Sequence, residues 1–151
     1  MGTEYYLYNH QNATVFELGK GPWFLIENKN MLHIASHFVA WLKENWGHSA
    51  TSIKYHKILA KAVKDFSEGT PDSSLEVWGD CGEELGWAGS LGYVCTGSRY
   101  SLSDPVKNRE CVSIINELIL RLKNDYLTLT DKDREYLITK GWNFKNYAPK
   151  L

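Results

Sequence analysis

The stretch EVWGDCGEELGWAGSLGYVCTGSRYSLSD, residues 76–104, decides how the chain folds. It holds six of the chain's twelve glycines, all between Gly79 and Gly97. Glycine costs a helix about 1 kcal/mol per position relative to alanine, so a long helix is not expected here. The stretch instead predicts strands and turns, with one strand at residues 75–78 and another at residues 91–96.

The segments on the N-terminal side predict a β-hairpin followed by two helices. Residues 5–9 and 14–18 are rich in aromatic and β-branched side chains and flank a polar turn, which is typical of a hairpin. A short apolar run at residues 23–26 is a candidate for a third strand or for a segment that plugs the core. Apolar residues then recur at helical spacing within residues 28–47 and 49–69, and the short link between them predicts an αα-hairpin.

The C-terminal side predicts a long helix. Asp104 is a suitable cap and Pro105 fits the first turn, where its missing N–H does no harm. Apolar residues at helical spacing continue to Tyr126, and Ile114 and Leu120 widen this stripe. We therefore expect this helix to be the most buried in the fold.

A short fourth helix is expected from a capping box at residues 130–133 to Gly141, followed by an aromatic tail at residues 142–147 that packs back on the body. The order of elements predicts an α+β fold in a single domain, residues 1–151. Its antiparallel sheet of about four strands, made of the N-terminal hairpin and the central strands, packs against the αα-hairpin and the two C-terminal helices.

Composition indicates a globular protein of the reducing cytoplasm. The 151 residues are 43% hydrophobic and 23% charged, and no run is long and apolar enough to span a membrane. Three cysteines, an odd number, argue against a disulfide framework. The N-terminus lacks a signal sequence, so no membrane partner is expected.

Charge is unevenly distributed along the chain. Residues 76–104 hold five acids and one arginine, a net charge of −4, whereas residues 105–151 hold nine bases and six acids. A row of lysines at residues 54, 57, 61 and 64 could meet phosphates, but such a row is more often the solvated face of a helix. We therefore do not expect nucleic acid as a partner.

No motif for a metal, cofactor or nucleophile is complete. His33 and His37 share a helical face, but Ile34 stands where a zincin has glutamate. The acids near Asp80 do not follow the calcium-loop pattern. Structural burial is the simpler interpretation for Cys95 and Cys111, and no histidine stands beside either of them in sequence. We expect no cofactor, no metal and no assigned catalytic residue.

The acids of the central stretch stand among aromatic residues, which is the composition of a protein-binding surface. The predicted partner-binding residues are Trp78, Asp80, Glu83, Glu84, Trp87, Tyr93 and Arg99. The competing interpretation puts the tryptophans in the core and leaves the acids solvated.

The leading hypothesis is a non-enzymatic protein-binding module, such as an immunity or inhibitor protein that blocks a basic partner, for example a nuclease toxin. The alternative is a small enzyme or ligand-binding protein with a carboxylate-containing pocket between residues 76–100 and the αα-hairpin.

The N-terminal hairpin also carries a family resemblance. Tyr5-Tyr6-Leu7-Tyr8-Asn9, followed by residues 16–21 (FELGKG), resembles the start of small uncharacterised bacterial and phage-type proteins. The resemblance covers under a fifth of the chain. It implies a microbial cytoplasmic protein and no particular activity.

Overall fold

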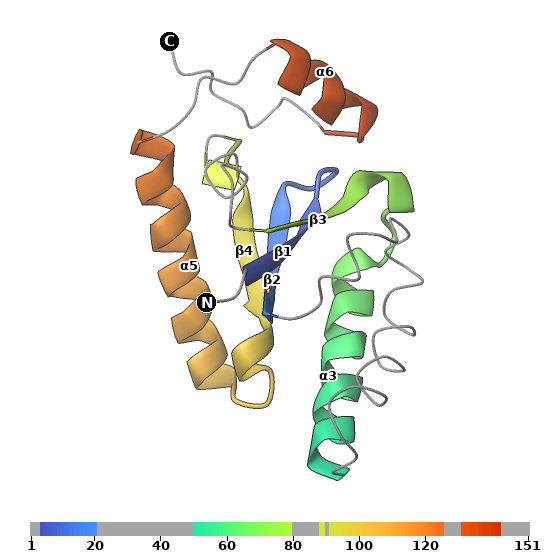
Figure 1. The fold of residues 1–151 in the computed structure, drawn as a ribbon, viewed down its shortest axis with the longest axis vertical. Coiled ribbons are helices and arrows are strands. Elements are labelled where there is room, and N and C mark those ends of the chain that lie inside the picture. The colour runs from blue at the N-terminus through green and yellow to red at the C-terminus, as the bar shows by residue number, and fades with distance from the viewer. Residues whose placement is uncertain (1–3, 21–49, 80–87, 90, 126–130, 143–151) are drawn as a thin grey trace.

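A computed structural model describes residues 4–20, 50–79, 88–89, 91–125 and 131–142. These residues form one four-stranded sheet with a helix on each face and a third helix across its end (Figure 1). The strands are β1 (Glu4–Asn9), β2 (Thr14–Lys20), β3 (Leu75–Gly79) and β4 (Val94–Ser98), and the helices are α3 (Ala50–Ser67), α5 (Pro105–Asp125) and α6 (Asp131–Thr139). The α+β class is confirmed. No helix in the described part of the chain is long and apolar enough to cross a membrane.

The sheet is mixed, with the strand order β3-β1-β2-β4. The predicted hairpin is present, and β1 pairs antiparallel with both β2 and β3. The prediction of a fully antiparallel sheet was wrong for one pair of strands, because β4 runs parallel to β2. The chain crosses the sheet between β3 and β4, because these two strands form its opposite edges. Leu91 and Gly92 belong to a turn, so β4 begins three residues later than predicted.

Helix α5 closes the outer edge of β4 with two asparagine side chains. The Asn116 amide accepts from the Cys95 backbone N–H at 2.8 Å and donates to the Cys95 carbonyl at 3.2 Å. Asn108 Oδ1 accepts from the backbone N–H of Ser98 at 3.2 Å. The asparagines thereby satisfy edge groups that would otherwise be open to another strand.

Side chains alternate across the sheet and build a core on each face. The face toward α3 is lined by Leu7, Phe16, Leu18, Leu75 and Val77, which pack with Leu59 and Val63. The face toward α5 is lined by Tyr6, Tyr8, Val15 and Cys95, which pack with Ile115 and Ile119. Because both faces are covered, β1 and β2 are nearly continuous runs of buried residues.

Helix α5 begins as predicted, but the stripe of buried apolar residues that faces the sheet is narrower than predicted. Asp104 Oδ1 accepts from the backbone N–H groups of two residues in the first turn, at 3.1 and 3.2 Å. Ile115 and Ile119 are buried, whereas Ile114 is 65% and Leu120 is 60% exposed. The expectation that these two residues widen the buried stripe was wrong. Each lies about 100° around the helix from its buried neighbour, which turns it away from the sheet.

The remaining helix predictions have different outcomes. Helix α3 confirms the helix predicted at residues 49–69. The helix predicted at residues 28–47, and with it the αα-hairpin, lies outside the described residues, as does the apolar run at residues 23–26. Helix α6 confirms the fourth helix, and the fully buried Leu137 joins it to the α5-side core. Trp142 packs into the same core, as expected of the start of the tail.

Candidate functional site

The structure describes only part of the predicted partner-binding surface. Asp80, Glu83, Glu84 and Trp87 lie outside the described residues. Trp78 lies in the edge strand β3, where its backbone pairs with β1. The residues on either side of the acidic segment belong to the described fold. Gly79 is the last residue of β3, and Ala88 is completely buried in the α5-side core.

Tyr93 and Arg99 are interior residues, with 3% and 5% of their surface exposed. The prediction placed both on a contact surface, and the structure corrects this. Arg99 Nη1 donates to the Leu18 carbonyl at 3.3 Å, which fixes the guanidinium against the end of β2. The two residues flank β4 at its opposite ends, about 20 Å apart along the strand. Among the described residues next to β4, Val94 and Tyr100 instead expose about half of their surface, 53% and 52%.

A buried polar network links the hairpin turn to β3, β4 and α6. His10, only 2% exposed, lies 2.8 Å through Nε2 from Glu76 Oε2 and 2.6 Å through Nδ1 from the Tyr93 hydroxyl. A carboxylate only accepts, so Nε2 donates to Glu76, and in the neutral ring Nδ1 accepts from Tyr93. From α6, the Tyr136 hydroxyl donates to Glu76 Oε1, and Nζ of Lys140, which directly follows α6, lies 3.9 Å from the same oxygen.

The order carboxylate, imidazole, hydroxyl matches a catalytic triad, but the environment opposes catalysis. Activation of a nucleophile needs a lowered pKa and access for a substrate. Burial raises the pKa of the Tyr93 hydroxyl, and the nearby Glu76 charge raises it further. The hydroxyl is also directed at His10 inside the protein. The network therefore fits a structural role, holding α6 and the hairpin turn on the sheet.

His10 and Glu76 were not among the predicted site residues. The sequence placed His10 in a polar turn, yet the structure buries it with its ring stacked on Tyr8 at a centroid distance of 6.1 Å. One signal was available. Tyr6, Tyr8 and His10 follow the period of two that places residues on one face of a strand.

A second buried polar group is a carboxyl on β2. Glu17 is 8% exposed and accepts from the Ser98 hydroxyl at 2.5 Å and from the Tyr6 hydroxyl at 3.5 Å. Burial raises the pKa of the Glu17 carboxyl, and the Ser98 hydrogen bond opposes that shift only in part. A buried acid that bridges β1, β2 and β4 ties the sheet together.

The predicted burial is confirmed for Cys95, whereas Cys111 is only partly buried. Burial raises the pKa of the Cys95 thiol to about 11, so this group is protonated at neutral pH and is a poor nucleophile. Cys111 is half-buried, and its sulfur lies 3.2 Å from the Ser101 hydroxyl. Cys81 lies outside the described residues.

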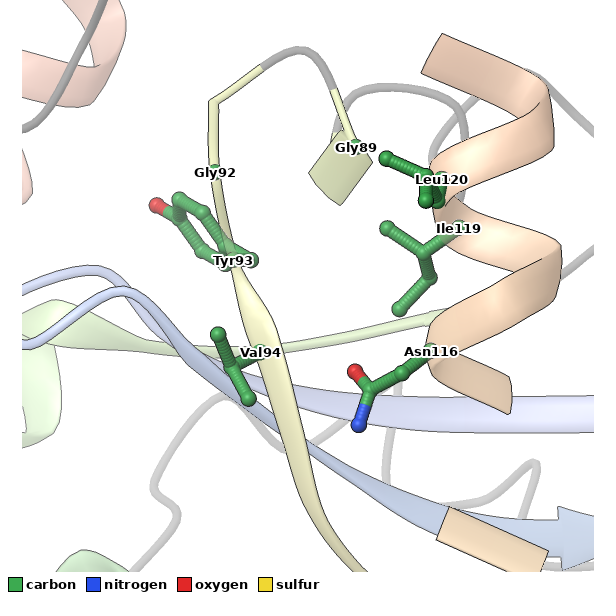
Figure 2. Close-up of a pocket in the computed structure, with 7 residues that line it drawn as sticks. All are labelled: Gly89, Gly92, Tyr93, Val94, Asn116, Ile119 and Leu120. Carbon is green, nitrogen blue, oxygen red and sulfur yellow. The ribbon is translucent and has the colours of Figure 1, made fainter. Parts of the chain in front are cut away.

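A pocket of about 260 Å³ lies between α5 and the start of β4 (Figure 2). It is lined by Gly89, Gly92, Tyr93, Val94, Asn116, Ile119 and Leu120. The side chains of Ile119 and Asn116 point from α5 toward the strand, whereas the Tyr93 ring turns away from the helix (Figure 2). No carboxylate lines it, so this is not the pocket that the enzyme hypothesis expected beside the αα-hairpin.

Within the described residues, no group of three or more histidine, cysteine or acidic side chains is placed to hold a metal ion. Comparison with known proteins adds no family: no protein-family model matches the chain, and neither a curated protein nor a solved structure matches it significantly.

Proposed function

We propose that this protein is a non-enzymatic protein-binding module that blocks a basic partner, in the manner of an immunity or inhibitor protein such as one directed against a nuclease toxin. The binding surface includes the acidic segment Asp80, Glu83 and Glu84 with the neighbouring Trp78 and Trp87. The proposal places the protein in the cytoplasm, a reducing compartment in which Cys95 and Cys111 stay free.

The observation that carries the proposal is that the described residues on either side of this acidic segment belong to the sheet and to the core. Gly79 pairs with Tyr5 in the sheet, and the side chain of Ala88 is completely buried. The eight residues between Gly79 and Ala88 include three acids, and this segment joins the described fold at both of its ends. Binding residues are commonly carried on segments that connect the elements of a rigid scaffold.

A concentrated negative charge suits a basic protein better than it suits a small substrate. Residues 76–104 have a net charge of −4 in a chain whose overall formal charge is −1. Such a field raises the association rate with a positively charged surface and penalises acidic competitors. The described polar residues offer no comparable support for catalysis, because the Glu76–His10–Tyr93 network faces the interior.

The proposal is tested by recovering partners with three forms of the full chain. One is the wild type, and one is the Asp80→Ala, Glu83→Ala, Glu84→Ala variant. The third is a control variant, Glu110→Ala, Glu117→Ala, Glu135→Ala, which removes the same charge from exposed positions on α5 and α6. We expect a basic protein that binds the wild type and the control variant and is lost from the first variant.

Two results would contradict the proposal. One is a set of partners that is the same for all three forms, which would make the acidic segment irrelevant to binding. The other is equal loss from both triple variants, which would show that net charge alone, rather than this segment, attracts the partner. Circular dichroism of each form distinguishes lost binding from lost folding.

A further inference from the structure

We draw no further inference here: the strongest candidate, the apolar pocket between α5 and the start of β4, carries nothing, because the amide of its one polar side chain on α5, Asn116, is already paired with the Cys95 backbone and nothing in the described part of the structure shows what covers it.

Discussion

Asn116 is the residue on which the outer edge of the sheet depends, because its one side chain pairs with both backbone groups of Cys95. Leucine of similar size would leave a buried N–H and a buried C=O without partners, at a cost of about 1–3 kcal/mol each. We expect Asn116→Leu to lower the free energy of unfolding by about 2–4 kcal/mol in a urea titration.

The control for this substitution is Ser113→Ala, at an exposed position on the same helix. It should change stability by less than about 0.5 kcal/mol. Amide hydrogen exchange gives a local readout, since the Cys95 N–H should lose protection in Asn116→Leu before the strand pairs β1–β2 and β1–β3 do. An Asn116→Leu protein as stable as the wild type would show that α5 does not serve as the edge partner of β4.

Because the Glu17 carboxyl is buried, we expect the stability of the folded protein to depend on pH. Burial raises the pKa of this carboxyl above the ordinary value for glutamate, so the folded protein holds this proton more tightly than the unfolded chain does. Its favourable contribution is therefore complete below the unfolded pKa and is lost as pH rises through the higher folded pKa. Glu17→Gln keeps an acceptor for Ser98 and carries no charge. We expect its melting temperature to exceed that of the wild type at pH 7 and to approach it at pH 4.

The decisive comparison for Glu17 is a pair of melting curves measured from pH 4 to pH 8. A difference in melting temperature that grows with pH fits the raised pKa. A difference that shrinks with pH, or a variant less stable at pH 7, would mean that the charged form is the one that the fold stabilises.

For single residues, the sequence indicated which side chains are of interest but did not predict which of them face the interior. It singled out Tyr93 and Arg99, and both are interior, whereas Val94, which it did not select, is exposed. Neighbouring residues in an extended segment face opposite ways, so a shift of one residue in the strand start exchanges inside for outside. His10 was missed because a turn residue was expected to be solvated.

Helix α5 offers a matched pair of residues of one type for testing its orientation. Ile115 is 6% exposed and Ile114 is 65% exposed. Removing a buried isoleucine side chain costs about 2–5 kcal/mol, and an exposed one costs less than about 0.5 kcal/mol. We expect Ile115→Ala to lower the denaturation midpoint strongly and Ile114→Ala to leave it nearly unchanged. Equal effects would contradict the helix orientation described here.

Local signals predicted the elements well, because a helix start is encoded in a few adjacent residues. Asp104 and Pro105 marked the beginning of α5, and the observed hydrogen bonds of Asp104 are those of a cap. The width of the buried stripe was not predictable in the same way. Apolar spacing shows that a helix is amphipathic, but the partner surface decides how much of the apolar side is covered.

At the scale of the whole molecule, the order and direction of the strands in the sheet could not be predicted from the sequence. The β1–β2 hairpin followed from a short turn, but the parallel pairing of β4 with β2 joins segments about 80 residues apart in the chain, as Glu17 and Ser98 illustrate. No local residue pattern encodes such a partner, because parallel pairing depends on the crossover that precedes it. The α+β class survived this error because it depends on the elements and not on their order.

The same crossover gives the molecule its candidate binding surface. It carries the chain from β3 at one edge of the sheet to β4 at the other, and its described residues Ala88 and Leu91 pack in the α5-side core. The acids at positions 80, 83 and 84 belong to this connection. We therefore expect their contribution to binding to be electrostatic, which means a faster association at low salt.

The most direct test of this account is the association rate of the recovered partner with the wild type and with the Asp80→Ala, Glu83→Ala, Glu84→Ala variant, measured at low and at physiological salt. The account predicts that the variant associates roughly ten-fold or more slowly at low salt, with a smaller difference at physiological salt. Equal association rates for the two proteins at both salt concentrations would contradict the claim that the acidic segment recognises a basic partner.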